Sequence, residues 1–196
     1  MREESYSMGV LLANNLAGQV DVDGLDFDAM AKGLVDVLKG GELEMTEKEA
    51  NFTAQKFLQE SAAKLAMKAQ EIEATFLAEN AEREGIVSRP SGLQYEILTE
   101  GTGKVPQIHE KVVAHYEGKL LSGKIFDSSY KRGEPATFPV NGLIQGWQEA
   151  LQIMPVGSKW RLYIPSNLGY GARGAGNDIP GNATLIFDLE LLEIVG

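Results

Sequence analysis

The sequence predicts an α+β chain in which an all-α N-terminal part with a long helix precedes an antiparallel β-sheet wrapped on one short helix. Two observations predict this. No proline occurs among the first 89 of the 196 residues, where helix-forming residues dominate. All seven prolines and most β-branched residues follow, in a pattern of short strands and turns. We therefore expect two domains, 1–88 and 89–196.

A long helix over residues 47–84 is the best-marked element of the first part. Thr46 and Glu49 form a capping box, in which each side chain bonds the backbone N–H of the other residue. Neither glycine nor proline follows until Gly85, which suits a helix C-terminus. Apolar residues alternate at spacings of four and three from 58 to 76. This stripe indicates either a short coiled-coil seam or a solvated helix packed along one side.

Two shorter helices are expected before it. One covers residues 4–17 and ends at Gly18, and the other covers residues 27–39, with a cap at Asp26 and an end at Gly40. Each has one apolar face. Two short helices and a rod bury little surface alone, so we expect a homodimer through these N-terminal helices.

The second part reads as short strands joined by turns. Expected strands cover residues 94–98, 111–121, 136–140, 159–164 and 184–194. A hairpin turn is expected at 121–124. One short helix, at 144–153, precedes Pro155. Strands with a single helix predict an antiparallel sheet packed on that helix.

Composition excludes several functions. The chain has 18 basic and 28 acidic residues and a net charge of −10, without a basic cluster, which argues against nucleic-acid binding. It has no cysteine, so disulfides and thiol nucleophiles are excluded. His109 and His115 lack metal-site spacing, and Ser128 and Ser129 lack the context of a serine hydrolase. The glycines of 171–176 fit no phosphate-binding motif. We expect no cofactor and no metal.

The sequence also bears on location. The apolar run of residues 10–13 is interrupted by Asn14 and Asn15, which does not suit a secretory leader. No apolar run approaches the length of a membrane span. We predict a cytoplasmic location, with a periplasmic one as the alternative if a leader has been removed.

An aromatic set without a nucleophile remains. Its members are Tyr116, Phe126, Trp147, Tyr170 and Phe187, and by itself such a set is more often core than site. Their neighbouring segments change this interpretation, since they follow a fixed order: 115–120, 126–129, 144–147, 157–159, 170–171 and 183–192. This ordered series closely resembles the FKBP-type peptidyl-prolyl isomerase domain, over roughly residues 91–195.

The helical part resembles, more loosely, the dimerisation region of the bacterial two-domain branch, the macrophage infectivity potentiator (Mip)-like isomerases. The residues concerned are 6–9, the long capped helix and the junction 80–86. The resemblance implies a V-shaped homodimer that accelerates rotation of Xaa-Pro bonds in unfolded or partly folded polypeptides. It also implies possible inhibition by macrolides.

The resemblance further implies roles for individual residues. Trp147 would form the floor beneath the proline ring, Asp127 is the family's buried carboxylate, and Arg132 would order Asp127 or Tyr170. The Tyr170 hydroxyl and the Ile144 amide would hold substrate carbonyls. The expected catalytic residues are Tyr116, Phe126, Asp127, Trp147, Tyr170 and Phe187, and the expected substrate-binding residues are Phe138, Leu143, Ile144, Arg132 and Ile179.

Two places depart from single-domain relatives. Ala136 stands where those relatives have an aromatic residue, and residues 175–178 replace a bulkier, more apolar loop. We expect a pocket with a smaller, more polar wall. This change should alter which substrate residues are preferred beside the proline, and it should alter the affinity for macrolides. These changes also leave room for a second hypothesis. The protein would then be a peptide-binding holdase chaperone. Its helical part would bind the clients, and its isomerase site would be vestigial. A purely structural dimer has no positive feature to support it.

Overall fold

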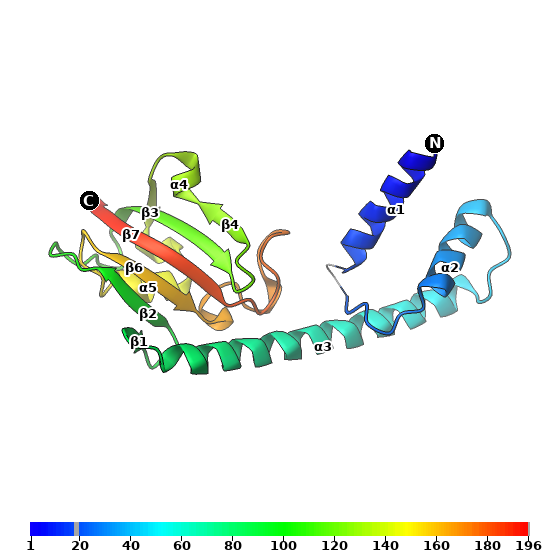
Figure 1. The fold of residues 1–196 in the computed structure, drawn as a ribbon, viewed down its shortest axis with the longest axis horizontal. Helices are drawn as coiled ribbons and strands as arrows, with labels where there is room; N and C mark the ends of the chain where they lie inside the picture. The colour runs from blue at the N-terminus through cyan, green and yellow to red at the C-terminus, as the bar shows by residue number, and fades with distance from the viewer. Residues whose placement is uncertain (18–19, 196) are drawn as a thin grey trace. The chain divides into compact units, whose positions relative to one another are not determined.

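The computed structural model describes residues 1–17 and 20–195, and its architecture is α+β as predicted (Figure 1). Three helices come first. The elements in chain order are α1 Arg2–Ala17, α2 Phe27–Lys39, α3 Glu47–Ala81, β1 Ile86–Ser88, β2 Gln94–Thr99, β3 Lys111–Leu120, β4 Ile125–Ser128, α4 Ser129–Arg132, β5 Ala136–Pro139, η1 Val140–Gly142, α5 Gln145–Leu151, β6 Lys159–Ile164, η2 Ser166–Leu168, η3 Gly171–Arg173 and β7 Leu185–Val195.

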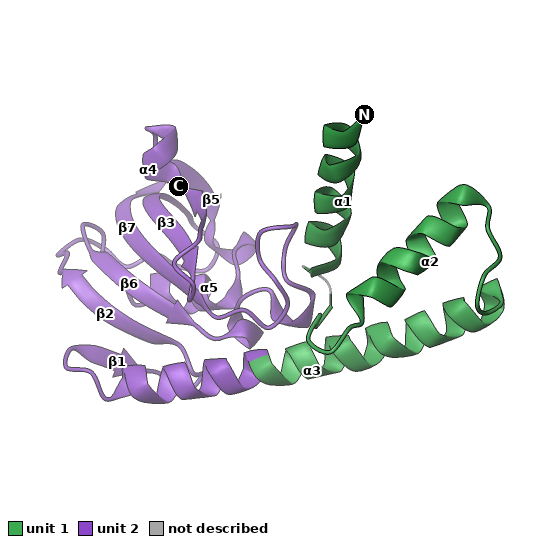
Figure 2. Ribbon diagram, turned by 45° about the vertical axis from the view of Figure 1, so that its right-hand side comes forward, with its two compact units in different colours: residues 1–68 green, residues 69–196 purple. Residues whose placement is uncertain are grey.

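The chain divides into two compact units, Met1–Lys68 and Ala69–Gly196 (Figure 2). The division falls within α3, whereas the sequence-based boundary at 88/89 lies after it. The last turns of α3 belong with the sheet because they pack on it. The ring of Phe76 lies 5.9 Å from that of Tyr163, and the Asn80 amide donates to the Gln94 side chain at 2.8 Å.

The short helices of the first unit begin and end close to prediction. The Asp26 side chain caps α2 by accepting from the backbone N–H of Ala29 at 2.9 Å, and Gly40 ends it in the left-handed conformation that glycine tolerates best. Helix α1 begins two residues earlier than expected, and its predicted stop at Gly18 lies outside the described residues. Neither helix has a buried residue.

The capping box at the start of α3 is confirmed. The Glu49 carboxylate accepts from the backbone N–H of Thr46 at 2.9 Å, and the Thr46 hydroxyl accepts from the N–H of Glu49 at 3.3 Å. The predicted end at residue 84 is wrong, since α3 ends at Ala81. The N–H groups of Glu82 and Arg83 turn back to carbonyls three residues earlier, which closes the helix before Gly85.

The apolar stripe along α3 is only partly covered within the single chain. Leu58 and Ile72 are exposed, while Phe76 at its C-terminal end packs on the sheet. Among the helices that the structure describes, none is long and apolar enough to cross a membrane.

The seven strands form one antiparallel sheet in the order β1-β2-β6-β7-β3-β4, with β5 also paired to β3. Strand β3 pairs with three other strands. It pairs with β7 along its whole length, while its other edge is shared by β5 at the start and β4 at the end. Strands β1 and β4 were not predicted because runs of three and four residues show too little alternation.

Helix α5 packs on the sheet and closes the core. Its residues Trp147, Ala150 and Leu151 are buried with alternate residues of β3, β6 and β7. Gly146 permits this approach, since a Cβ there would lie 2.5 Å from Cγ2 of Ile164 on β6. The predicted hairpin at 121–124 is present, with Gly123 donating to the carbonyl of Leu120 at 2.9 Å. It brings β4 back alongside the end of β3.

Candidate active site

A cavity of about 440 Å³ opens between α5, the strands β3, β4, β5 and β7, and the loop that precedes β7. Most predicted site residues line it, although Arg132 does not. The lining residues are Tyr116, Phe126, Asp127, Phe138, Gly142, Leu143, Ile144, Trp147, Tyr170, Ala175, Asp178, Ile179 and Phe187. The structure therefore brings together residues from positions 116 to 187.

The pleat of two strands aims Tyr116 and Phe187 toward the cavity. Residues 112, 114, 116 and 118 of β3 are buried in alternation, as are 185, 187, 189 and 191 of β7. Successive side chains of a strand point to opposite faces, so each aromatic ring lies on the core face of the sheet. The base of the cavity is thus continuous with the core.

Trp147 is the centre of the aromatic set. Its indole lies edge-on to three rings, with centroids 5.4 Å from Tyr116, 5.9 Å from Phe138 and 5.2 Å from Phe187. Edge-to-face contacts of this kind are favourable because the ring edge is positive and the ring face negative. With only 3% of Trp147 exposed, the indole is held in one orientation at the base of the cavity.

Gly118 was missed as a site residue and lies behind two of the rings. A Cβ at Gly118 would lie 2.5 Å from the ring of Phe187 and 2.6 Å from that of Phe126. These two rings are edge-on with centroids 5.5 Å apart, and they occupy the space that a side chain would need. Sequence offers only a weak signal for this, a glycine inside a strand.

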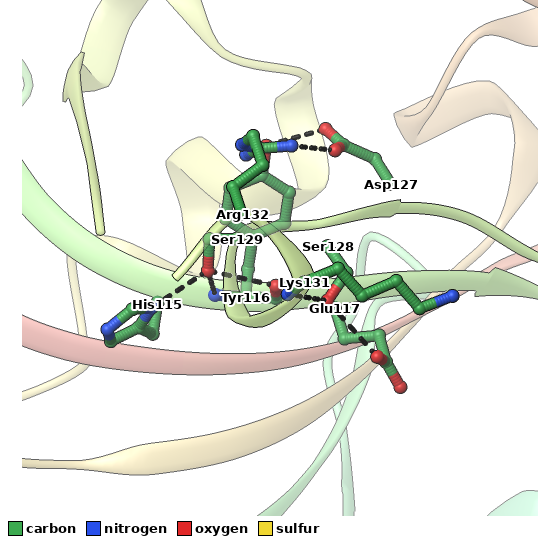
Figure 3. A network of polar contacts seen from close by, with 8 residues as sticks. All are labelled: His115, Tyr116, Glu117, Asp127, Ser128, Ser129, Lys131 and Arg132. Carbon is green, nitrogen blue, oxygen red and sulfur yellow. Dashed lines mark hydrogen bonds and ion pairs between the residues drawn. The ribbon is translucent and has the colours of Figure 1, made fainter. Parts of the chain in front are cut away.

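A polar group borders the aromatic cavity (Figure 3). The Tyr116 hydroxyl donates to the Asp127 carboxylate at 2.5 Å, and the Arg132 guanidinium donates to both, reaching the hydroxyl at 2.8 Å. Burial would raise the pKa of Asp127, but its hydrogen bonds with Tyr116 and Arg132 outweigh burial and hold that pKa below the usual value. Asp127 is therefore ionised at neutral pH.

The tyrosines of the site stay protonated. Burial raises the pKa of Tyr116, and the Asp127 carboxylate raises it further against the opposing effect of Arg132. Burial, and then the charge of Asp127, also raise the pKa of Tyr170. Both hydroxyls can therefore donate hydrogen bonds over the whole physiological range.

Two donors at the cavity have no acceptor within the described part of the chain. One is the backbone N–H of Ile144, which precedes the first turn of α5, and the other is the hydroxyl of Tyr170, a residue 41% exposed. Both groups are suited to donate a hydrogen bond to a carbonyl oxygen of a ligand in the cavity.

Ser129 was rejected as a nucleophile in the sequence and belongs to the segment 126–129 of the ordered series, and its place is structural. It is fully buried, and its hydroxyl accepts from the backbone N–H of Tyr116 at 2.7 Å, with the Tyr116 carbonyl at 3.1 Å and His115 Nδ1 at 3.0 Å also in range (Figure 3). It anchors α4 to β3. No local pattern marks this role of Ser129, because its partners lie 13 and 14 residues earlier; only the cap of α4 is local, with Ser128 accepting from the Lys131 N–H.

A sheet wrapped on one helix, with an aromatic cavity beside that helix, defines an FKBP-type domain. Residues 103–192 match the family model of the FKBP-type peptidyl-prolyl cis-trans isomerase, and residues 1–97 match that of the domain amino terminal to it. The chain belongs to the FKBP-type peptidyl-prolyl cis-trans isomerases, in the two-domain branch that includes the Mip proteins.

Individual relatives agree over nearly the whole chain. The FKBP-type 22 kDa peptidyl-prolyl cis-trans isomerase of Escherichia coli is 42% identical, with 98% of this chain and 95% of the relative covered. The outer membrane protein MIP of Legionella longbeachae is 42% identical over 97% of this chain and 84% of its own. The crystal structure of FkpA from Escherichia coli superposes with a TM-score of 0.73 at 31% identity, covering 98% of this chain and 95% of that one. The protein is thus a peptidyl-prolyl cis–trans isomerase.

Proposed function

We propose that the cavity floored by Trp147 is where this isomerase binds proline and rotates the preceding peptide bond, without a covalent intermediate. The observation that carries this is the indole held edge-on by three aromatic rings at the base of the cavity. Such a floor offers a flat apolar surface against which a pyrrolidine ring can pack. No side chain of the site needs to act as a nucleophile.

The chemistry follows from the resonance of the amide bond. Rotation has a barrier of about 18–20 kcal/mol because the planar amide has partial double-bond character. In the twisted transition state the carbonyl oxygen loses negative charge, so an apolar cavity disfavours the polar planar form more than the twisted one. A ten-thousandfold acceleration requires only about 5.5 kcal/mol of such differential binding.

Two donors would hold the substrate in place. The N–H of Ile144 and the hydroxyl of Tyr170 are unpaired beside the cavity and suit two carbonyl oxygens of the peptide. Fixing the chain on both sides of the proline limits its motion to rotation about the one bond. Asp127 was expected to be a buried carboxylate, but its side chain is 43% exposed. Of the two partners expected for Arg132, it bonds Asp127, and it also bonds the Tyr116 hydroxyl. Asp127 and Arg132 would thus orient Tyr116.

Replacement of Trp147 tests the pocket. We expect Trp147→Ala to lower kcat/KM for an Xaa-Pro peptide by more than about tenfold, since the floor of the cavity is lost. Trp160 is the matched control, because it does not line the cavity but is as buried as Trp147, with 3% exposed in each. Each also has an indole N–H without a partner in the described residues. Trp147→Phe should reduce turnover and Trp160→Phe should not. Wild-type turnover in Trp147→Ala would remove the pocket assignment.

The substrates we propose are proline-containing, unfolded or partly folded polypeptides. The loop at one side of the cavity contributes Ala175 and Asp178, in the segment that replaces the bulkier loop of single-domain relatives. The cavity should therefore admit varied residues beside the proline. Macrolide inhibitors should compete for the same cavity. Inhibition of peptide turnover, measured across several residues before proline, tests both statements.

We also propose a homodimer formed through the N-terminal helices. In α2 the residues Phe27, Met30, Leu34 and Leu38 follow helical spacing on one face, and each is 42% exposed or more. The opposite side of α2, with Ala29 and Gly33, faces the start of α3. The apolar face therefore lacks a partner among the described residues of its own unit, and a second copy would cover it.

The second candidate, a holdase chaperone, draws on the same exposed apolar residues of the N-terminal unit. We propose it as a companion activity. Trp147→Ala in the full-length chain separates the two, because aggregation of an unfolded client should still be suppressed when peptide turnover is lost. Loss of both together would assign the suppression to the pocket.

The cytoplasmic location predicted from the sequence gains no support from the comparisons. A relative 42% identical to this chain is named as an outer membrane protein. We propose the periplasmic alternative on this ground. Fractionation of cells into cytoplasm, periplasm and membranes, followed by detection of the protein, tests it.

A further inference from the structure

We propose that Glu73, on α3, is a positioning residue for the active-site cavity, because its carboxylate holds both ends of the loop that carries Tyr170 and Ile179. The inference rests on the proposed function of that cavity and deepens it. Glu73 and the loop belong to the same unit, Ala69–Gly196. The end of the long helix would then support the site itself, in addition to linking the domains.

The Glu73 carboxylate accepts three hydrogen bonds from two residues distant in sequence. Its Oε2 accepts from the backbone N–H of Ser166 at 2.6 Å and from the Thr184 hydroxyl at 2.8 Å. Its Oε1 accepts from the Ser166 hydroxyl at 3.0 Å. Ser166 and Thr184 are only 7% and 3% exposed, and hydrogen bonds to a charged acceptor are strongest where water is scarce.

The loop between these two residues is tied to itself. The backbones of Ala175 and Ile179 exchange two hydrogen bonds, of 2.9 and 3.1 Å, and the N–H of Asn182 donates to the carbonyl of Gly171 at 2.8 Å. A Cβ at Gly174 would lie 2.1 Å from the carbonyl oxygen of Ile179, so the two arms of the loop touch. A loop bonded in this way moves as a body when its ends move.

The loop between Ser166 and Thr184 forms one wall of the cavity. Tyr170, Ala175, Asp178 and Ile179 all line the cavity and all lie between the two residues that Glu73 holds. Tyr170 is four residues after Ser166. A small shift of the loop ends would therefore displace the Tyr170 hydroxyl from a substrate carbonyl. Misplacement of a binding group by about 1 Å can cost about a hundredfold in rate.

Other contacts of the loop limit the loss of kcat/KM expected when the Glu73 carboxylate is removed. Leu168 and Ile179 are buried in the core at 8% and 7% exposure, so the loop stays attached when Glu73 is removed. We therefore expect displacement and greater mobility of the loop, not its unfolding. A loss of about fivefold in kcat/KM is the corresponding estimate, well below the cost of a full misplacement.

The test compares Glu73→Ala, Glu73→Gln and the control Glu71→Ala in the full-length protein. Glu71 lies on the same helix, is exposed and makes none of these bonds. A glutamine can keep all three bonds, since its oxygen accepts from the Ser166 N–H and the Thr184 hydroxyl while its NH₂ donates to the Ser166 hydroxyl. Two readouts are needed: kcat/KM with an Xaa-Pro peptide, and amide hydrogen exchange across residues 166–184 relative to β3 and β7.

We expect Glu73→Ala to lose about fivefold in kcat/KM and to exchange faster in residues 166–184 alone, with Glu73→Gln restored to within about twofold of wild type and Glu71→Ala unchanged. Three results would overturn the inference: wild-type turnover in Glu73→Ala, faster exchange across β3 and β7 as well, or a glutamine variant as impaired as the alanine one. If wild-type protein lacks turnover, or Trp147→Ala retains it, the proposed pocket function fails, and local exchange still reports whether Glu73 holds the loop.

Discussion

The hydroxyl of Tyr116 donates a 2.5 Å hydrogen bond to the carboxylate of Asp127, and this pair joins the aromatic cavity to its polar border. This hydrogen bond is strongest when Asp127 is charged and Tyr116 is neutral. The hydrogen bond is charge-assisted only when Asp127 is ionised, and Tyr116 can donate it only when protonated. Both pKa shifts favour this state, since that of Asp127 is lowered from 3.8 and that of Tyr116 is raised from 10.0.

Activity should therefore be independent of pH across the neutral range. A lowered carboxyl pKa contributes stability that is present above the unfolded value and lost as pH falls through the folded one. A raised tyrosine pKa contributes stability that is lost only as pH rises through the folded value. We expect a flat kcat/KM between about pH 5 and 9, measured with an uncharged Xaa-Pro peptide. A midpoint near neutrality would instead reveal a titrating catalytic group.

Arg132 should set the acid limit of that plateau. Its guanidinium is among the groups that lower the pKa of Asp127, so Arg132→Gln should move the loss of activity at low pH to higher pH. The neighbouring Lys131→Gln is the control for charge, because Lys131 is exposed and contacts this network only through its backbone N–H. Equal shifts in both variants would contradict the specific role of Arg132.

Gly118 should tolerate no side chain. A methyl group there would lie within 2.6 Å of the rings of Phe126 and Phe187, so Gly118→Ala must displace both cavity rings. We expect a loss of about 1–3 kcal/mol in the free energy of unfolding, measured in urea, together with reduced turnover. Gly9→Ala is the control, since nothing lies within 4 Å of a Cβ at that helical position. Unchanged stability in Gly118→Ala would mean that the rings move freely.

The apolar face of α2 should control the oligomeric state. We expect Leu34→Asp, at a residue 47% exposed, to shift a dimer to monomer in analytical ultracentrifugation, because a charge cannot be buried unpaired in an apolar interface. Turnover of a short peptide per chain should not change, since the cavity lies wholly in residues of the other unit. Lys39→Asp, an exposed change on the other side of α2, is the control for charge. A dimer that persists in Leu34→Asp would exclude this face.

The sequence by itself determined the elements that local chemistry specifies. Helix α2 runs from Phe27 to Lys39 as predicted because Asp26 caps its start and Gly40 ends it, and both signals lie within a few residues. The capping box of α3 and the central strands were predictable for the same reason. The aromatic residues of the cavity were recognised through the ordered series of segments around them, which no single residue would have indicated.

Only the tertiary structure decided the relationships between distant residues. Glu73 meets Ser166 and Thr184 across 93 and 111 residues, and no local pattern marks a helical glutamate for that contact. The need for glycine at 118 depends on rings at 126 and 187, and the early end of α3 accompanies the bond between Asn80 and Gln94. Caps and periodicity act over a few residues, whereas these features arise from packing, which only the assembled sheet and helix define.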